Sequence, residues 1–387
     1  MKSNDPIIHQ RRRTTVTKKD FGMNNGNLEG ILYIADERQD GQLRDPLQPG
    51  RPLKGGVIVP RNLIRDLRLR PGLLLRGDQR GRTLGKIETI EGRSVEDYAE
   101  YATHIYDATA LDPQPMIKLE HNPAEVTTRI IDILCPVGFG QRGLIVAPPR
   151  SGKTILMQNI ARGVHANYPE VELVLLLIDE RPEEVTDMKR NVPGTVYASS
   201  NDNTVEKHLD LAQIIIERCK RKVEFGANIV VLLDSLTRLG RNFNIGGQSG
   251  GRTMSGGLDN RALEIPKRLF GAARKLEDGG SLTIIATCLI DTGSRMDQVI
   301  FEEFKGTGNM ELTLDRNLAN QRIYPALNIQ QSGTRKEEKL LTEHQLAAAR
   351  KVRRHLIDMQ PAQAMKNLLE ALAKHKTNQS LYDSMKV

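Results

Sequence analysis

Residues 143–154, GLIVAPPRSGKT, decide the fold that we expect for this chain. The apolar run GLIVA is typical of a buried strand, and the segment ILMQNIARG after Thr154 has the apolar spacing of a helix. The loop between them ends in Gly152, Lys153 and Thr154, which suits it to bind phosphate. Backbone N–H groups and a helix N-terminus would face the anion, the lysine would contact the terminal phosphates, and the hydroxyl would ligate Mg²⁺.

Ala147 occupies the position where this loop pattern usually has its first glycine. The prediction of a phosphate loop therefore depends on the context of strand, loop and helix, and a chance Gly-Lys-Thr turn is the alternative.

Apolar runs alternate with amphipathic segments from this loop onward. The strand-like runs that follow it are VLLLIDE (174–180), TVYASS (195–200), NIVVLLDS (228–235) and SLTIIATCLI (281–290). Residues 204–223, TVEKHLDLAQIIIERCKRKV, have the apolar spacing of a helix between two of them. This alternation predicts an α/β fold with a doubly wound, mainly parallel sheet.

The chain divides by composition into four segments. We expect residues 1–27 to be a basic, flexible arm, for which a merely solvated tail is the alternative. Residues 28–97 have short apolar stretches between Gly, Pro, Asp and Asn clusters, which predicts a small all-β barrel. Residues 98–125 contain DPQP and HNP and are interpreted as a linker. Residues 126–387 would form the nucleotide-binding domain with its C-terminal helices.

The bulk composition limits the class of protein. The 387 residues carry a formal net charge of +8, which favours a polyanionic partner such as nucleic acid. Cys135, Cys219 and Cys288 lack the spacing of a metal or redox site, so we expect reduced, buried thiols. The longest apolar runs are far too short for a membrane span, and no secretory signal is recognisable, so we expect a cytoplasmic protein without membrane contact.

Two of the strand-like runs end in acidic residues. Asp179-Glu180 and Asp234 would both lie at the carboxyl edge of a parallel sheet, where the ligands of α/β proteins bind. By spacing alone, Asp179 could ligate a metal with Glu180 as the catalytic base, and Asp234-Ser235 is the rival pair. Either aspartate could instead be the N-cap of the following helix.

Several blocks, in order along the chain, carry a family resemblance. Those similar to blocks of bacterial transcription termination factor Rho are APPRSGKT (147–154), LLLIDERPEEVTDM (175–188), VVLLDSLTRLGR (230–241), GGSLTIIATCLIDTGSRMDQVIFEEFKGTGNMEL (279–312) and SGTRKEE (332–338). The resemblance covers roughly residues 117–387. It is weaker over residues 28–97, and the N-terminal region as a whole looks shortened and divergent. It implies a RecA-like P-loop ATPase domain preceded by an OB-like or cold-shock-like barrel.

By this resemblance the cofactors are ATP and Mg²⁺. Asp234 is expected to be the carboxylate linked to the metal, together with Thr154, and Lys153 is expected to contact phosphate. Glu180 is expected to polarise the attacking water. The resemblance thus revises the assignment that spacing alone suggests.

The resemblance also implies the lining of the ATP pocket. Tyr324 is a candidate for stacking on the base, and Arg181 would line the pocket unless it pairs with Glu183 or Glu184. The other implied pocket residues are Gly138, Phe139, Gly140, Gln141, Arg142, Gly143, Arg150, Ser151, Gly152, Lys153, Thr154 and Ile155.

Arg335, in the turn SGTRKEE, would by similarity reach into the ATP site of a neighbouring subunit as an arginine finger. Catalysis would then need a homohexameric ring. Arg322 and Arg238 resemble further arginines near that interface.

Two glycine-rich loops resemble the central-channel loops of the family. They are residues 246–257, which contain Arg252, and residues 305–309, which begin with Lys305. Mobile glycines let backbone N–H groups approach phosphates while the cation supplies charge. Taken in isolation, both loops could be simple connecting turns.

The barrel is the RNA platform that the resemblance implies, with bases stacked on aromatic rings. Of the expected aromatic positions only Tyr33 is aromatic here, and Ile31 and Ile58 stand at the others. The alternative is that the barrel binds RNA mainly through positively charged side chains. It would use the basic residues Arg61, Arg65, Arg68, Arg70 and Lys86, which a simple solvated surface would also explain.

The function that the resemblance implies is an ATP-dependent RNA translocase or helicase, moving 5′ to 3′, that facilitates transcription termination. It would bind nascent single-stranded RNA and release the transcript from the RNA polymerase elongation complex. One rival is a rotary-type ATPase subunit with the same core. The other is a non-catalytic RNA-binding protein on a decayed ATPase fold.

Overall fold

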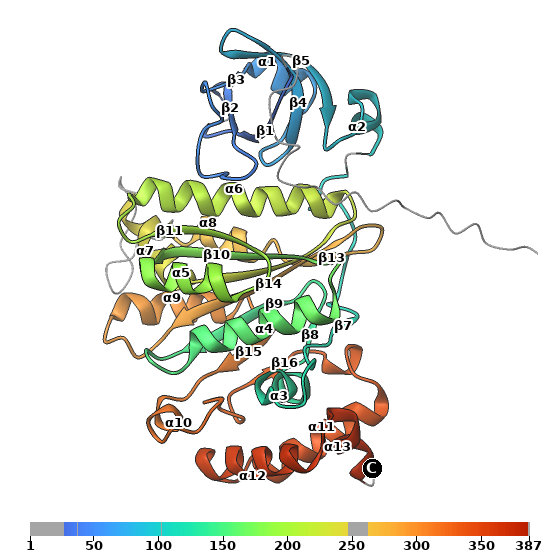
Figure 1. Cartoon of the computed structure of the whole chain (residues 1–387), viewed down its shortest axis with the longest axis vertical. Helices are drawn as coiled ribbons and strands as arrows, with labels where there is room; N and C mark the ends of the chain where they lie inside the picture. The colour runs from blue at the N-terminus through green and yellow to red at the C-terminus, as the bar shows by residue number, and fades with distance from the viewer. Residues whose placement is uncertain (1–26, 37, 102, 247–261, 386–387) are drawn as a thin grey trace, which may run out of the picture.

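The computed structural model describes residues 27–36, 38–101, 103–246 and 262–385, and shows a small barrel beside a larger layered domain (Figure 1). The barrel strands, in the closed order β1-β2-β3-β5-β4, are β1 (Asn27–Tyr33), β2 (Gly41–Arg44), β3 (Ile58–Val59), β4 (Leu74–Arg80) and β5 (Thr83–Ile90). Their inward residues, such as Leu32, Leu43 and Leu75, are fully buried. The predicted all-β barrel is confirmed. Strand β2 was not expected, because GQLR has almost no apolar pattern.

The larger domain is built on a sheet with the order β11-β10-β12-β14-β9-β15-β16. Its strands are β9 (Arg142–Ala147), β10 (Glu172–Glu180), β11 (Thr195–Ser200), β12 (Asn228–Asp234), β14 (Ser281–Leu289), β15 (Met310–Thr313) and β16 (Gly333–Thr334). Neighbours in this order pair in parallel except β15 and β16, and two further short strands join the sheet through an antiparallel pairing with β14. The expected doubly wound, mainly parallel sheet is therefore confirmed.

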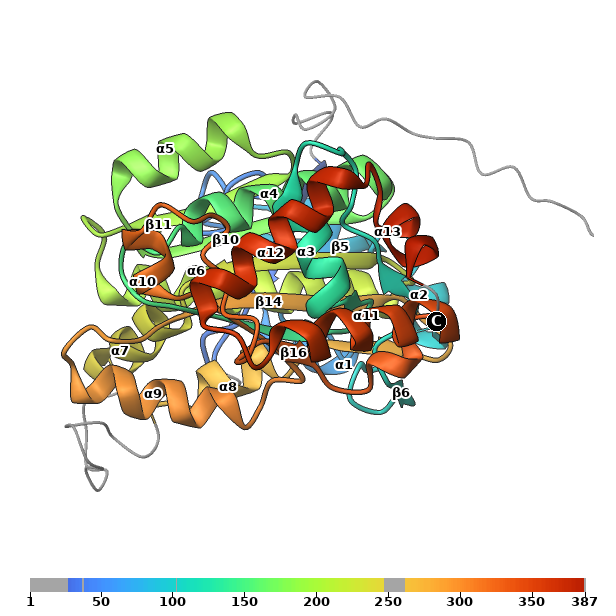
Figure 2. The ribbon, with the colours of Figure 1, turned by 90° about the horizontal axis from the view of Figure 1, so that it is seen from below.

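Helices cover both faces of this sheet (Figures 1 and 2). One face packs on α3 (Val126–Leu134), α4 (Lys153–Asn167) and α5 (Pro182–Asn191). The other face packs on α6 (Val205–Glu224), α7 (Leu236–Gly246), α8 (Glu264–Phe270) and α9 (Arg295–Lys305). Strands such as ELVLLLIDE are apolar almost throughout because both faces of the sheet are covered.

The segment predicted as a linker contributes to the larger domain. After α2 (Val95–Tyr101), β6 (Ala110–Leu111) pairs with β13 (Arg274–Leu276), and β7 (Met116–Ile117) pairs with β8 (Val137–Gly138). Ile117 and Leu119 are fully buried in the core. Residues 103–125 are therefore part of the packed structure and not a free connection.

The C-terminal helices are α11 (Glu343–Leu356), α12 (Pro361–Lys374) and α13 (Asn378–Ser384), preceded by α10 (Arg316–Asn320) and a 3₁₀ turn at Glu337–Lys339. They lie against α3, on the side of the domain opposite the barrel (Figure 1). Helix α11 begins with a capping box, in which Thr342 and Gln345 satisfy each other's backbone N–H groups.

The barrel rests on α6 of the larger domain. Helix α1 (Arg61–Asp66) follows β3 within the barrel, and the turn before β4 brings Gly72 against the backbone of Glu217 and Arg218 in α6. Arg70 binds both carboxylate oxygens of Glu224 at 2.9 Å. These contacts define one extended interface between the two domains.

Two expectations about composition can be compared with the structure. The cysteines Cys135, Cys219 and Cys288 are free and buried, as predicted, and burial raises the pKa of each thiol to about 12. Within the described residues, no helix combines the length and apolar character needed to cross a membrane.

Candidate ATP site

The phosphate loop joins β9 to α4 and is shaped by left-handed residues. Arg150 has φ +63° and Gly152 has φ +95°, and α4 begins immediately afterwards at Lys153. The hydroxyl of Ser151 donates to the carbonyl of Pro148 at 2.7 Å, which closes the turn from within. The exposed end of the loop presents Arg150, Thr154 at partial exposure, and Ile155, which is 59% exposed. Such alternating backbone conformations create the concave, N–H-lined surface that binds phosphate.

Lys153 lies between the two candidate acids. Its Nζ donates to both carboxylate oxygens of Asp234, at 2.6 and 2.5 Å, and lies 3.9 Å from Oε1 of Glu180. The acids come from the carboxyl ends of adjacent parallel strands, β10 and β12. The structure thus brings Lys153, Glu180 and Asp234 together at one edge of the sheet.

Glu180 is the acid with the perturbed pKa. It is 2% exposed, and this burial raises the pKa of its carboxyl to about 8, with a smaller raising effect from the charge of Asp234. Lys153 and Arg238 oppose the shift. Arg238 lies 2.9 Å from Oε2 of Glu180 and donates to the backbone carbonyl of Asp179. Arg238 therefore contacts Glu180 of its own chain, whereas the family resemblance implied a place near the subunit interface.

Asp179 points away from Lys153. Its φ is +57°, and the register of β10 against β11 shifts between Ile178 and Glu180. The side chain of Asp179 lies 4.0 Å from Nε2 of the buried His208. The local turn of the backbone separates the two neighbouring acids, so the metal-ligand role that spacing alone suggested for Asp179 is not supported by the geometry.

Thr287 is a residue of this site that sequence reasoning missed. It is fully buried on β14, and its hydroxyl donates to Oδ1 of Asp234 at 2.7 Å. The only available signal was a hydroxyl residue near the carboxyl end of an apolar strand, and that signal is too common to single out one threonine.

Three other residues predicted for the pocket or the subunit interface, Tyr324, Arg181 and Arg322, lie in different surroundings. A Cβ on Gly152 would lie 3.7 Å from the ring of Tyr324, so this half-exposed ring borders the phosphate loop. Arg181 forms an ion pair with Glu184 at 3.9 Å, which is the alternative considered for it. Arg322 is exposed at a left-handed φ of +60° in the turn that leads to Tyr324.

The segment Gly138–Gly143 does not lie beside the phosphate loop in the single chain. It precedes and begins β9, whereas the loop follows the last residue of that strand, Ala147. At about 3.3 Å per residue, the five steps from Arg142 to Ala147 span about 16 Å. Within one protomer the side chains of Gln141 and Arg142 contact the loop at residues 305–309. That the segment 138–143 lines an ATP pocket stays a prediction.

Arg335 also lies at this opposite edge. It follows β16, is exposed, and lines a cavity of about 260 Å³ together with Lys305, Gly308 and Asn309. The candidate arginine finger and one candidate RNA loop are thus neighbours, and both are separated from the Lys153 site of the same chain by the length of β9.

Two barrel positions that were considered for stacking on RNA bases, Ile31 and Tyr33, lie against the larger domain. The hydroxyl of Tyr33 donates to Asp210 of α6 at 2.6 Å, and the guanidinium of Arg44 covers its ring at 4.2 Å. Ile31 is buried in the core beneath α6. Both positions therefore face the larger domain, because alternate residues of β1 point to that side. Tyr33 is partly buried and lines a cavity of about 490 Å³ together with residues of α6, and its role in RNA binding stays a prediction.

Several other barrel residues that were considered for RNA binding are exposed. Ile58 lines a shallow hollow formed with residues 38–42. Arg61, Arg65, Arg68 and Lys86 are exposed, whereas Arg70 is held by Glu224 and belongs to the interface. Arg252 and the basic arm at residues 1–26 lie outside the described residues.

Comparisons with known proteins agree with this architecture. Residues 127–334 match the model of the ATP synthase alpha/beta family, nucleotide-binding domain. The fold resembles the structure titled as a prototypical ATPase from the type III secretion system of pathogenic bacteria, with a TM-score of 0.59 over 71% of this chain and 84% of that one, at 23% identity. This likeness concerns the fold alone.

Curated relatives are considerably more similar in sequence. Transcription termination factor Rho of Streptomyces lividans is 52% identical over 92% of this chain, which spans about half the length of that relative. The Rho proteins of Akkermansia muciniphila and Bacillus subtilis are each 46% identical over 92% of this chain, which covers 76% and 84% of them. With its P-loop, its paired acids and these relatives, the chain belongs to the ATP-dependent transcription termination factor Rho family.

Proposed function

We propose that this chain assembles as a homohexamer that hydrolyses Mg·ATP at subunit interfaces and uses the energy to move 5′ to 3′ along single-stranded RNA. In this proposal it acts in the cytoplasm on nascent RNA and releases the transcript from the RNA polymerase elongation complex. Its relatives carry the name transcription termination factor Rho.

The observation that carries the ring proposal is the separation of two functional edges. Lys153, Asp234 and Glu180 converge at the carboxyl edge of the sheet, and Arg335 is exposed at the opposite edge. One chain cannot bring Arg335 to its own phosphate loop without dismantling β9. A neighbouring subunit, however, can present its Arg335 edge to this loop.

The residues at the loop fit a magnesium ion. Thr154 offers a hydroxyl and Asp234 a carboxylate, and hard oxygen ligands of this kind are those that Mg²⁺ takes alongside phosphate oxygens. Both carboxylate oxygens of Asp234 are engaged by Lys153. We therefore expect Lys153 to transfer from Asp234 to the phosphates when Mg·ATP binds, which frees the carboxylate for the metal.

Glu180 is suited to act on water in this site. Its buried carboxyl lies 3.9 Å from Nζ of Lys153, which is expected to bind the terminal phosphate, and burial raises its pKa to about 8. Once deprotonated, Glu180 would be a stronger base than an exposed glutamate. Arg238, which contacts Glu180, would hold that carboxylate in place until nucleotide binds.

Coupling to RNA is tested by measuring ATP hydrolysis with and without a panel of single-stranded RNA homopolymers. We expect strong stimulation in the assembled wild-type ring and none in Lys153→Ala. Hydrolysis at equal rates with and without RNA would contradict RNA coupling. It would favour the rotary-type rival, whose nucleotide-binding domain this chain resembles.

The role of Arg335 in a neighbouring site is tested by mixing two inactive variants. Rings that contain both Arg335→Ala and Lys153→Ala subunits should recover part of their hydrolysis, because some interfaces then combine an intact Lys153 with an intact Arg335. An arginine finger contributes about 10³ to 10⁵ in kcat, so recovery should be well above background. Co-assembled rings without any recovery would refute the role in trans.

A further inference from the structure

A β-bulge at Asp179 separates the two acids at the end of β10. Ile178 pairs with Ser199 of β11 and Glu180 pairs with Ser200, so β10 has one residue more than its neighbour here. The extra residue, Asp179, has a left-handed φ of +57°, which is uncommon for a residue with a side chain. Bulges re-aim the side chains beside them. The direction of Glu180 therefore depends on the groups that hold Asp179 in this conformation.

His208 spans this bulge from one strand to the other. It lies in the first turn of α6 and is 2% exposed. Its Nδ1 lies 2.6 Å from the hydroxyl oxygen of Ser199, and its Nε2 lies 4.0 Å from Oδ1 of Asp179. One imidazole ring is thus beside both the bulged residue and the partner strand at the start of the bulge.

The surroundings of His208 favour one position for its ring proton. Burial lowers the pKa of the ring, against a smaller raising effect of Asp179, so His208 is neutral at pH 7. A neutral ring that faces a carboxylate through Nε2 is most stable with its hydrogen on that nitrogen. Nδ1 then accepts a hydrogen bond from the hydroxyl of the buried Ser199. The N–H of Nε2 consequently faces the carboxylate of Asp179.

Helix α7 supplies further contacts to Asp179. Nδ2 of Asn242 lies 3.4 Å from Oδ2 of Asp179 but also donates to the carbonyl of Arg238 at a shorter 2.9 Å. Arg238 in turn donates to the backbone carbonyl of Asp179. Helix α7 therefore holds the main chain and one carboxylate oxygen of the bulged residue, and His208 lies beside the other oxygen.

A residue with a side chain keeps a left-handed conformation where its surroundings determine it, and His208 is a buried part of those surroundings that also contacts the partner strand. We propose that His208 is a positioning residue for Glu180. Anchored on Ser199, it keeps the carboxylate of Asp179 turned away from Lys153 and maintains the bulge that directs the following acid to the site. This inference rests on the proposed role of Glu180 in activating water and adds to it a residue of α6 that acts through Asp179.

The test measures ATP hydrolysis by the assembled full chain at saturating polycytidylate. His208→Phe keeps a ring of similar size but loses both nitrogens. We expect kcat to fall at least about tenfold, because small misplacements of a catalytic group cost that much or more. The KM for ATP should change by no more than about twofold, since Glu180 acts on water and not on nucleotide binding. A fully active His208→Phe ring would overturn the inference, as would a loss confined to KM.

Two polar replacements separate positioning from a general loss of packing. The amide nitrogen of His208→Gln can take the place of Nε2 beside Asp179, whereas that of His208→Asn reaches only the place of Nδ1 beside Ser199. We expect the Gln variant to retain most of the kcat and the Asn variant little of it. Equal kcat values in this pair would contradict the role of His208, and the pair decides alone if His208→Phe rings do not assemble.

His121→Phe is the control for replacing a histidine outside the beginning of α6. His121 is partly buried, and its Nδ1 lies 3.1 Å from the carbonyl of Leu119. Its replacement should leave kcat unchanged. A loss equal to that of His208→Phe would show that the effect is not specific to the bulge.

A double-variant comparison decides whether His208 acts through Asp179. Adding His208→Phe to Asp179→Ala should lower kcat by no more than about twofold beyond Asp179→Ala alone, because both changes release one bulge. Losses that multiply would overturn the inference. If Glu180→Gln hydrolyses ATP at the full rate, the proposed role of Glu180 fails and this inference fails with it. If Glu180→Gln is inactive and His208→Phe is fully active, only the inference fails.

Discussion

At the scale of single residues, the charge balance of the ATP site depends on very few contacts. Asp234 is 1% exposed, and among the residues that the structure describes, Lys153 and Thr287 donate hydrogen bonds to its carboxylate. Once Lys153 turns to the phosphates, Thr287 is the contact that remains. The orientation of the metal ligand should then depend on this hydroxyl.

Thr287→Val tests that dependence. The change preserves shape but removes the hydrogen bond to Oδ1 of Asp234, so we expect about a tenfold loss in apparent Mg²⁺ affinity or in kcat for ATP hydrolysis. Titration of the ATPase rate with Mg²⁺ measures it. Thr283→Val is the matched control on the same strand, because Thr283 is equally buried but accepts a hydrogen bond from Gly140 instead. Equal Mg²⁺ dependence in both variants would show that Thr287 has no special role.

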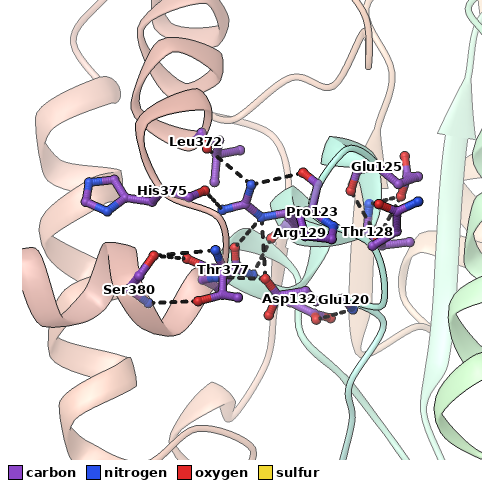
Figure 3. Close-up of polar contacts among 12 residues, drawn as sticks. Glu120, Pro123, Glu125, Thr128, Arg129, Asp132, Leu372, His375, Thr377 and Ser380 are labelled. Carbon is purple, nitrogen blue, oxygen red and sulfur yellow. Dashed lines mark hydrogen bonds and ion pairs between the residues drawn. The ribbon is translucent and has the colours of Figure 1, made fainter.

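At the scale of elements, a buried polar network attaches α3 to the C-terminal helices (Figure 3). Arg129 of α3 is 1% exposed and donates to the carbonyls of Leu372 at 3.2 Å and His375 at 2.7 Å, at the end of α12. It also lies 3.4 Å from the carboxylate of Glu120. The last carbonyls of α12, which lack partners within the helix, are thereby satisfied by a side chain from another element.

Arg129→Ala should destabilise this attachment severely. It removes the buried one of the two cations beside the Glu120 carboxylate, the other being the exposed Lys118 at 3.5 Å, and it leaves two carbonyls without donors. Breaking a buried ion pair in this way typically costs about 3 to 5 kcal/mol in the free energy of unfolding. Urea denaturation provides the measurement. The exposed Arg354 of α11 is the control, and Arg354→Ala should cost less than about 0.5 kcal/mol. A similarly small loss for Arg129→Ala would mean that the helices are held by apolar packing alone.

Asp132, in the same network, predicts a pH dependence of stability. Burial raises the pKa of its carboxyl to about 7, although the N–H groups of Leu119 and Glu120 donate to it. Between about pH 4 and pH 7 the folded chain therefore binds more protons than the unfolded chain. The free energy of unfolding contributed by Asp132 should be highest below pH 4 and should fall by about 2 to 4 kcal/mol up to pH 7.

The measurement compares wild type with Asp132→Asn by urea denaturation across pH 4 to 8. The difference between their unfolding free energies should change through this window and become constant above about pH 7. A pH-independent difference would show that Asp132 is ionised throughout. Comparing the two proteins removes the contribution of Glu180, whose raised pKa acts in the same direction in both.

At the scale of the whole molecule, the barrel and the ATPase domain are joined through α6. Gly72 has φ +88°, and a Cβ there would overlap the backbone of Glu217 in α6. Its carbonyl accepts Nη1 of Arg218 at 3.2 Å, and Arg218 also binds Glu91. The close approach of the two backbones is what lets Arg70 reach Glu224 and Tyr33 reach Asp210.

Gly72→Ala should weaken the coupling between domains. The side chain pushes the barrel away from α6, so we expect a lower melting temperature, separate unfolding transitions for the two domains, and reduced RNA stimulation of hydrolysis. Scanning calorimetry resolves the transitions. Gly81→Ala is the matched control, because Gly81 also has a positive φ of +63° but nothing lies within 4 Å of its Cβ position. It carries the backbone strain, of about 1 kcal/mol or more, without the clash. Identical behaviour of both variants would contradict a steric role for Gly72.

Much of the site followed from local sequence pattern. The strand, loop and helix around Lys153 and the acids at two strand ends could be predicted, because periodicity and turn chemistry involve only neighbouring residues. Parallel strands end at one edge, so the sequence also indicated that Glu180 and Asp234 would approach the loop. Strand β2 escaped prediction because its burial comes from barrel closure and not from its own pattern.

By itself, then, the sequence determined the α/β class, the barrel, the phosphate loop and the set of candidate acids. Spacing left open which of the acids faces Lys153 and the family resemblance favoured Glu180, but only the tertiary structure gave the physical reason, which is that the turn at Asp179 diverts one of two adjacent carboxylates. It alone revealed that Tyr33 faces α6 and that Asn309 connects Arg142 with Arg335. These outcomes depend on the lateral order of strands and on contacts between distant segments, whose energies no local pattern encodes.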